Sequence, residues 1–266
     1  MSGIKKGWCP TLERPMESGD GLLVRLHIEN EKITVQEARA IAAYSAQYGN
    51  SQIDLTSRGN LQIRGVSKEN YAALYHALSA LGFTETPRTP RKESTPQLPE
   101  LGLITSDTLA LGLLFGRMTA DALAWLADVA NEVITLNSVR IVYLHGITAN
   151  ADALLREAEK NGFIIHTHDA RRKIEACSGA PACSSANGDT RNLAIAIAQN
   201  FPNLSQTIHV SGCAKGCACA KKMDVVITAA NGTYNMAFDA IAADAPVHIA
   251  LMQEDIMAMF TRTEAS

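Results

Sequence analysis

The stretch QIDLTSRGNLQIRGV, residues 52–66, decides the fold, because the elements around it recur later in the chain. Its apolar and polar residues alternate in the way that predicts a half-buried strand. A strand-like run at 22–28 and a helical pattern at 35–49 precede it. A second helical pattern at 68–83 follows and closes with Gly-Phe. We therefore predict the order strand, helix, strand, helix for this part of the chain.

The same order recurs in the second half of the chain. Residues 109–117 and 134–147 have strand-like patterns, and helical patterns follow them at 119–131 and 149–163. The last of these again closes with Gly-Phe. Two copies of one unit usually pack side by side into a pseudo-symmetric whole. The internal repeat therefore predicts one α+β domain made of two half-domains.

The character of the sequence changes after about residue 166. Two cysteine-bearing loops of small residues come first, followed by a helical pattern at 189–201 and a strand at 207–212. A hairpin is predicted at 223–238, turning at Asn-Gly, and a closing amphipathic helix at 251–261. We divide the chain into a first half-domain at 1–83, a proline-rich linker at 84–106, a second half-domain at 107–165 and a separate module at 166–266.

Five of the six cysteines lie between residues 177 and 219. Such clustering in a reducing compartment indicates metal or redox chemistry rather than a framework of disulfides. Five residues separate Cys177 from Cys183, and three separate Cys213 from Cys217. Four thiolates are the ligand set of a 4Fe-4S cluster. A zinc site usually has shorter spacings, so the spacing disfavours zinc without excluding it, and buried structural thiols are the third interpretation.

The residues around these cysteines are small. Gly179, Gly212 and Gly216 let the backbone approach closely and present N–H groups to thiolate or sulfide. We interpret Cys219 as a spare buried thiol and assign no role to Cys9. Small side chains in both loops leave room for a bulky inorganic core.

Composition sets outer limits on the function. The chain has 266 residues, 47% of them hydrophobic, which is enough for a globular core. A formal net charge of -3 and a pI near 6.2 argue against a nucleic-acid partner. We see neither an apolar run of membrane-spanning length nor an apolar signal core at the start, so we predict a cytoplasmic protein without a membrane partner.

The loops C-x5-C and C-x3-C resemble the 4Fe-4S module of the sulfite and nitrite reductase superfamily. The stretch TSRGNLQIRG, residues 56–65, looks like the Arg-bearing strand with which that superfamily's ferredoxin-like half-domains contact a tetrapyrrole. Within the superfamily, the motifs DLTSRGNLQIRG, LGLLFGR, ACSGAPAC and HVSGCAKGCA are most similar to the precorrin-3B synthase family. The resemblance covers both repeats and the cysteine module. It implies two ferredoxin-like half-domains followed by an α/β 4Fe-4S module.

The resemblance also implies a reaction. Members of that family are oxygen-dependent monooxygenases of aerobic cobalamin biosynthesis, which hydroxylate precorrin-3A at C20 and close a γ-lactone. The implied cofactors are a 4Fe-4S cluster on Cys177, Cys183, Cys213 and Cys217, and a non-haem iron beside it in place of siroheme. Electrons are expected from a separate donor protein, because no G-x-G-x-x-G fingerprint occurs at a strand–helix turn.

A precorrin carries many carboxylates, so its site needs several cations from different segments, and Arg suits this better than Lys. The resemblance singles out Arg58 for the substrate carboxylates, and Arg64 is expected on the same strand face. A further expectation is that cations recur at comparable places in both repeats. The predicted substrate-binding residues are Arg25, Arg58, Arg64, Arg117, Arg140 and Lys215.

The sequence does not locate the non-haem iron. Two histidines and one carboxylate commonly hold such an iron. The histidines on predicted strands or near the cysteine loops are His27, His145, His166, His168 and His209, and none is preferred.

Two other functions stay open. One is a siroheme-dependent reductase of sulfite or nitrite, in which Cys217 would bridge cluster and haem iron. The other is a non-catalytic electron-transfer or tetrapyrrole-binding accessory protein. It is suggested by a departure from the superfamily, whose first cluster-type module normally stands between the half-domains where this chain has only the linker. A homodimer would be one way to replace the missing wall of the pocket.

Overall fold

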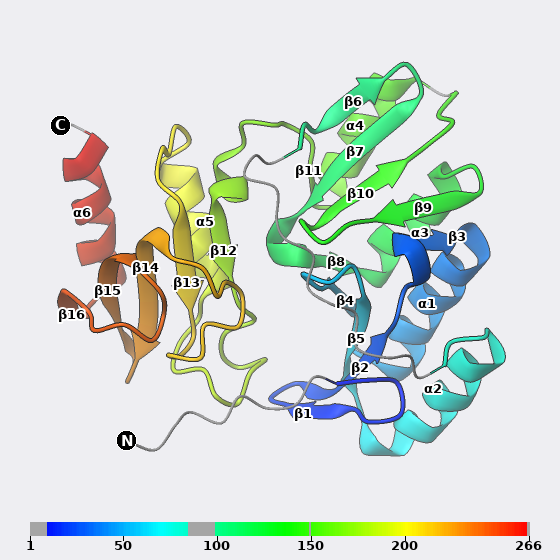
Figure 1. Cartoon of the computed structure of the whole chain (residues 1–266), viewed down its shortest axis with the longest axis horizontal. Helices are drawn as coiled ribbons and strands as arrows, with labels where there is room; N and C mark the ends of the chain where they lie inside the picture. The colour runs from blue at the N-terminus through cyan, green and yellow to red at the C-terminus, as the bar shows by residue number, and fades with distance from the viewer. Residues whose placement is uncertain (1–9, 85–98, 149, 265–266) are drawn as a thin grey trace. The chain divides into compact units, whose positions relative to one another are not determined.

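The computed structural model describes residues 10–84, 99–148 and 150–264 (Figure 1). The chain divides into two compact units, a larger one at Trp8–Thr167 and a smaller one formed chiefly by His168–Ser266. The described residues of both predicted half-domains fall in the larger unit, and the cysteine loops fall in the smaller one. Cys9 and most of the predicted linker lie outside the described residues.

Two sheets build the larger unit. The first runs in the order β1 (Met16–Ser18), β2 (Gly21–Leu26), β5 (Leu61–Val66), β4 (Gln52–Leu55) and β8 (Arg117–Thr119). The second runs β11 (Phe163–Ile164), β7 (Thr108–Leu113), β10 (Ile141–Leu144), β9 (Val133–Leu136) and β3 (Lys32–Thr34), with β6 (Gly102–Thr105) paired to β7. The end of the predicted linker is therefore a strand.

The two repeats exchange a strand rather than merely packing side by side. Strand β3 belongs to the first repeat but pairs with β9, and β8 belongs to the second repeat but pairs with β4. A short 3-10 turn precedes each exchanged strand, with Asn30 at φ 52° in one and Phe115 at φ 53° in the other. These left-handed residues redirect the chain. The single strand predicted at 109–117 was therefore wrong, because this turn splits it between two sheets.

The decisive stretch 52–66 is also two strands. Strands β4 and β5 are joined by a turn in which the Thr56 hydroxyl accepts from Asn60 N at 3.2 Å and Gly59 has φ 73°. The predicted strand 134–147 splits in the same way into β9 and β10. Alternation alone does not reveal such turns, since the apolar residues continue in phase on both sides.

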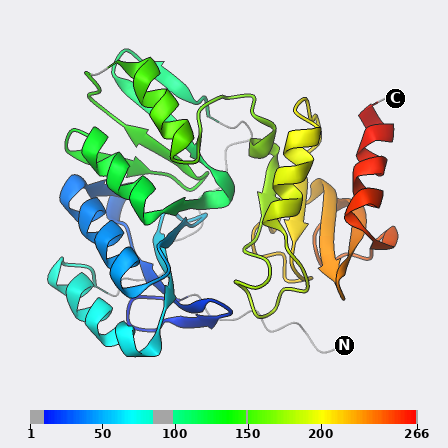
Figure 2. The ribbon, with the colours of Figure 1, turned by 180° about the vertical axis from the view of Figure 1, so that it is seen from behind.

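The four predicted helices of this unit are confirmed. They are α1 (Val35–Tyr48), α2 (Lys68–Ala80), α3 (Ala120–Val129) and α4 (Ala151–Lys160). Thr34, Ser67, Thr119 and Asn150 cap them by accepting a backbone N–H of the first turn. Figure 2 shows these helices in front of the strands. One apolar core of Val, Leu and Ile side chains lies between the helices and both sheets.

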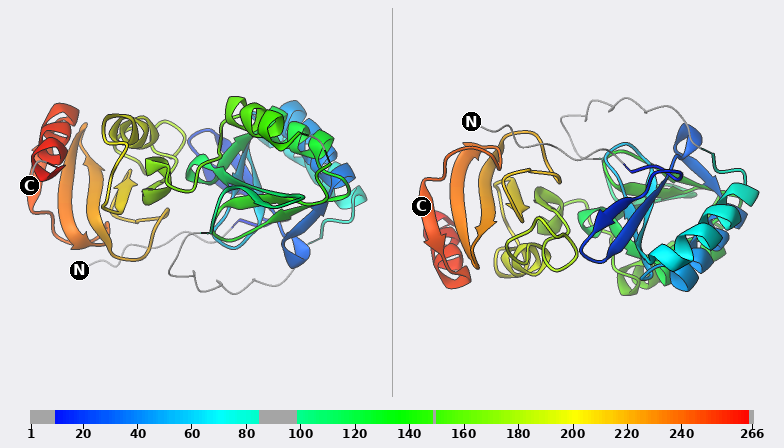
Figure 3. Two further views of the ribbon diagram at one scale, coloured as in Figure 1. Left: turned by 90° about the horizontal axis from the view of Figure 1, so that it is seen from above. Right: turned by 90° about the horizontal axis from the view of Figure 1, so that it is seen from below.

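The smaller unit is a five-stranded sheet with two helices. Its order is β12 (Ile174–Ala176), β13 (Ile208–Ser211), β14 (Met223–Ala230), β15 (Thr233–Ala240) and β16 (His248–Leu251), with the first three parallel. Helices α5 (Arg191–Asn200) and α6 (Gln253–Glu264) lie on the same face, where the Phe201 and Phe260 rings are 5.5 Å apart (Figure 3). The hairpin turn at Asn231 and Gly232 is confirmed. Strands β12 and β16 were not predicted.

No helix among the described residues combines the length and the apolar character needed to cross a bilayer.

Candidate functional site

The two cysteine loops begin at the same edge of the smaller sheet. Cys177 follows β12 and Cys213 follows β13, and these strands are adjacent and parallel. Carboxyl ends of parallel strands share one edge, which is where such sheets usually bind ligands. Gly212 N donates to Cys177 Sγ at 3.2 Å. A Cβ on Gly212 would lie 2.6 Å from Ala186 Cβ, so only glycine lets the second loop approach the first this closely.

The four predicted cysteines lie close together. The pKa of Cys217 is raised, first by burial and then by the neighbouring Cys213, Cys177 and Cys183, whereas Lys215 opposes the shift. Each of the other three thiols is therefore near enough to act electrostatically on Cys217. All four are free thiols. That these four cysteines hold a cluster stays a prediction.

Buried polar contacts hold the first loop. The Thr190 side chain is fully buried and donates to Cys177 O at 2.7 Å, and Arg191 Nε donates to the same oxygen at 3.3 Å. Gly179 has φ 66°, and a Cβ there would lie 2.7 Å from Thr190 Oγ1. These contacts fix the backbone beside Cys177. Thr190 was not predicted from the sequence, where the only feature that marks it is its position directly before a helix.

One lysine ties the two loops together. Lys215 Nζ lies 2.8 Å from Ser185 Oγ, so the residue in the C-x3-C loop holds the chain just beyond Cys183. The predicted contact of Lys215 with a substrate stays a prediction. Cys219 was expected to be buried but is only half-buried, and its Sγ lies 3.7 Å from Lys221 O.

The donor set fits an iron-sulfur cluster. Four convergent thiols, glycine-rich backbone and an N–H directed at one sulfur are what such clusters need. Cys177, Cys183, Cys213 and Cys217 would hold the group. Within residues 10–84, 99–148 and 150–264, no three or more His, Cys, Asp or Glu side chains are arranged to hold a single metal ion. The thiolates of a cubane bind four different irons and so stand farther apart than the ligands of one ion.

A row of polar side chains crosses the first sheet of the larger unit. In register across four strands stand Arg25 on β2, Gln62 on β5, Asp54 on β4 and Arg117 on β8. Arg25 Nη2 donates to Gln62 Oε1 at 3.0 Å. Arg117 binds Asp54 through Nε at 2.7 Å and Nη2 at 3.3 Å. Alternate residues of these strands enter the core, so this row occupies the face opposite the helices.

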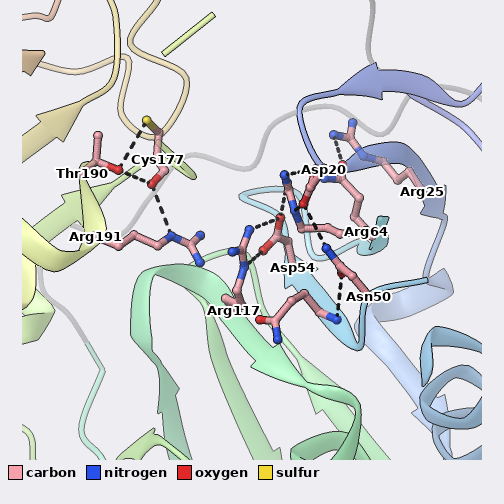
Figure 4. Close-up of polar contacts among 11 residues, drawn as sticks. Asp20, Arg25, Asn50, Asp54, Arg64, Arg117, Cys177, Thr190 and Arg191 are labelled. Carbon is pink, nitrogen blue, oxygen red and sulfur yellow. Dashed lines mark hydrogen bonds and ion pairs between the residues drawn. The ribbon is translucent and has the colours of Figure 1, made fainter. Parts of the chain in front are cut away.

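Arg64 lies beside this row, two residues along β5 from Gln62 (Figure 4). Its side chain is 3% exposed and binds Asp20 through Nε and Nη2, both at 2.9 Å, and Asp54 through Nη1 at 3.0 Å. Burial lowers the pKa of Arg64, but the two carboxylates more than offset this and raise it. So buried a guanidinium offers a ligand little surface, and the predicted contact of Arg64 with a substrate stays a prediction.

Arg58 and Arg140 lie in the turns between paired strands. Arg58 is in the β4–β5 turn and not on the strand, so the expectation that it shares a strand face with Arg64 was wrong. Arg140 has φ 64° and extends over Gly116, where a Cβ would be 2.7 Å from Arg140 Cδ. The Arg140 side chain therefore lies beside the residue that precedes Arg117.

Of the five predicted cations in the larger unit, only Arg117 has a cation, Lys32, at the equivalent place, so the expectation that cations recur in both repeats was wrong for the other four. The pair Leu55↔Leu61 of the first repeat corresponds to the pair Leu136↔Val142 of the second. The equivalent of Arg64 is therefore His145, and the equivalent of Arg58 is Val139. The equivalents of the other predicted cations are Ala110 for Arg25, Lys32 for Arg117 and Gly59 for Arg140. The residues that sequence analysis missed are Asp20, Asp54 and Gln62, which only the strand register brings to the arginines.

Comparison with known proteins first defines a class. Residues 14–81 match the nitrite/sulfite reductase ferredoxin-like half domain. The structure is similar to that of the Mycobacterium tuberculosis NirA protein, with a TM-score of 0.71 and 11% identity, over 92% of this chain and 80% of that one. This likeness shows the fold alone. The predicted α+β fold with a ferredoxin-like half-domain is confirmed, and the chain is similar to proteins of the nitrite/sulfite reductase superfamily.

The chain is also similar to a particular enzyme, a precorrin-3B synthase. It is 23% identical to precorrin-3B synthase from Sinorhizobium sp over 396 aligned residues, covering 92% of this chain and 85% of the relative. Since 92% of this chain is about 245 residues, about 150 aligned positions hold no residue of it. The relative is therefore substantially longer within the matched region.

Proposed function

We propose that this protein is an iron-sulfur oxidoreductase of the precorrin-3B synthase type, which hydroxylates precorrin-3A at C20 with γ-lactone formation. The observation that carries the proposal is that the two cysteine loops leave adjacent parallel strands and meet where Gly212 N donates to Cys177 Sγ, in a chain similar to precorrin-3B synthase. When bound, a 4Fe-4S cluster would supply one-electron transfer at these loops. The clustered free thiols support a reducing compartment, for which we propose the cytoplasm.

The cysteine loops would have two tasks. Their thiolates would hold the cluster, while Gly212 N and the Thr190 and Arg191 contacts keep Cys177 in place. The contact of Lys215 with Ser185 would keep the two loops at a fixed separation. A preformed loop pair lowers the ordering cost of taking up the cluster.

The arginines would bind the substrate. Arg25, Arg58, Arg117 and Arg140 come from different strands and turns, so they can meet carboxylates at different places on a macrocycle rim. Arg64 would act through its contact with Asp54, and Lys215, which lies in the smaller unit, is proposed separately as a substrate-binding residue. Their guanidinium groups would orient the substrate. Binding energy used in this way favours reaction at one position of the macrocycle.

The reaction defines the remaining partners. One atom of dioxygen enters the substrate at C20, and the other leaves as water with two electrons and two protons. We propose an external protein as electron donor and a non-haem iron as the oxygen-binding centre, whose ligands the described residues do not identify. A homodimer is proposed as the source of any pocket wall that this chain itself lacks.

The test uses the full chain, reconstituted anaerobically with iron and sulfide and then reduced. Incubated with precorrin-3A and ¹⁸O-labelled dioxygen, it should give a hydroxylated lactone that carries one labelled oxygen at C20. Cys183→Ser is the matched control and should give no product. A product without label, or recovery of unchanged precorrin-3A, would contradict the oxygenase assignment.

Two alternatives have distinct outcomes in the same preparation. Strong visible haem bands after isolation with siroheme, together with sulfite or nitrite reduction, would assign the chain to the reductases. The about 150 aligned positions that hold no residue of this chain favour a second alternative, a non-catalytic accessory protein. That protein would bind the tetrapyrrole and accept electrons but leave it unmodified.

A further inference from the structure

One carboxylate joins cations from the two repeats. Asp54 on β4 accepts from Arg117 on the exchanged strand β8 and from Arg64 on β5. Its Oδ2 receives both Arg64 Nη1 at 3.0 Å and Arg117 Nη2 at 3.3 Å, and its Oδ1 receives Arg117 Nε at 2.7 Å. Asp54 is thus shared between two guanidinium groups.

This arrangement is electrically balanced. Two like charges placed this close would repel each other, and Asp54 between them removes that cost. With Asp20 on the far side of Arg64, two carboxylates meet two guanidinium groups. A neutral cluster attracts a distant anion weakly, so its contribution lies in geometry rather than in field strength.

The geometry is tightly constrained. Arg64, Asp54 and Arg117 have side chains that are 3%, 15% and 17% exposed. The planar guanidinium of Arg117 is held at two points by one carboxylate, which fixes its rotation as a single contact would not. Arg25 continues the row through Gln62, the cross-strand neighbour of Asp54.

We propose that Asp54 is a positioning residue: held by Arg64, it sets the orientation of Arg117 toward the carboxylates of a tetrapyrrole. The proposal rests on the proposed function, since it assumes a polycarboxylate macrocycle as ligand. Asp54 itself does not contact the ligand. It selects ligands whose carboxylates match the orientation that it imposes.

The test exploits opposite expectations for Asp54→Asn. Removing a negative charge near a polyanion should strengthen binding if electrostatic attraction alone matters. If Asp54 positions Arg117, the same change should weaken binding. The probe is uroporphyrin III, an octacarboxylate, titrated against the full reconstituted chain by fluorescence quenching at fixed ionic strength. We expect a Kd about tenfold higher, since freeing a charged two-point contact costs on the order of one tenfold step.

Selectivity separates positioning from general loss of structure. Coproporphyrin III, a tetracarboxylate, lacks half of the carboxylates, so its binding should depend less on Arg117. The Kd for coproporphyrin divided by the Kd for uroporphyrin should therefore fall in Asp54→Asn, whereas partial unfolding would raise both Kd values by the same factor. Asp128→Asn is the matched control, because it removes the same charge from an exposed pair with Arg39 and should leave both Kd values unchanged.

A second variant covers the case in which Asp54→Asn does not fold. Arg117→Lys keeps the charge but loses the two-point contact, and it should reduce uroporphyrin binding and selectivity in the same direction. Equal or tighter uroporphyrin binding by the folded variants, with unchanged selectivity, would overturn the positioning role and leave the proposed function standing. No uroporphyrin binding by the wild-type chain would count against the tetrapyrrole substrate and with it this inference.

Discussion

The two repeats of the larger unit share one backbone design and differ in what their helix-free sheet faces contain. In the first repeat, Asp54 and Arg64 form part of a buried ion-pair network. In the second, the equivalent residues are Thr135 and His145, and His145 lies 3.3 Å from the Thr135 hydroxyl and 3.4 Å from that of Thr108. The fold therefore does not require charge at these positions. The charge in the first repeat needs another reason, and ligand binding is the one we propose.

The apolar content of the two faces differs in the same way. The second face has a small apolar cluster formed by Leu101, Ala110, Ile141 and Ile164. Ala110 and Ile141 replace Arg25 and Asn60 of the first repeat. An apolar face needs no partner charges and can be closed by its own neighbours. The duplication thus kept a scaffold in both copies and placed the ion-pair network on one sheet.

The largest expected effect compares equivalent residues of the two repeats. Arg64→Ala leaves Asp20 and Asp54 partly buried without their shared cation, so it should lower the free energy of unfolding by about 3–5 kcal/mol. His145→Ala removes an exposed ring with two long hydrogen bonds and should cost less than about 1 kcal/mol. Urea unfolding of both variants, followed on the transition of the larger unit, measures the difference. Equal losses would contradict the asymmetry.

A smaller effect concerns the turn residues Gly59 and Arg140, which are equivalent and both left-handed, at φ 73° and 64°. Gly59→Ala should destabilise by about 1–2 kcal/mol, because it adds backbone strain and a Cβ 3.1 Å from Glu31 Cγ. Arg140→Gly should relieve strain and stabilise by up to about 1 kcal/mol. If Arg140 serves the ligand, the same variant should bind uroporphyrin III more weakly. Stabilisation with unchanged binding would remove Arg140 from the site.

The parts of the fold that local pattern dictates were predictable. Helix periodicity gave α1 to α6, and the Asn231-Gly232 dipeptide gave the hairpin of the smaller unit. The strand exchange was not predictable, because it depends on single left-handed residues, Asn30 and Phe115, inside stretches that otherwise read as continuous strand. Strand β12 is only three residues long, which is too short to show a period.

The candidate site divides along the same line. Cysteine spacing was enough to propose the four thiols, since the two members of each pair lie in one short loop and are close in sequence. The arginines were chosen by residue type, and the partners that decide their role come from far along the chain. Asp20 is 44 residues from Arg64, and Asp54 is 63 from Arg117. Only strand pairing brings such residues together, so Asp54 could not be recognised from its local sequence.

The central claim is that the smaller unit carries a 4Fe-4S cluster, because the arginines of the first repeat would otherwise bind a ligand without any redox centre. The most direct test is the metal content of the chain. Iron and acid-labile sulfide are counted per full-length chain after anaerobic reconstitution, for the wild type, Cys183→Ser and Cys219→Ser. The account predicts about four of each in the wild type and in Cys219→Ser, and loss of the cluster and its colour in Cys183→Ser. Four irons retained by Cys183→Ser, or none bound by the wild type, would contradict it.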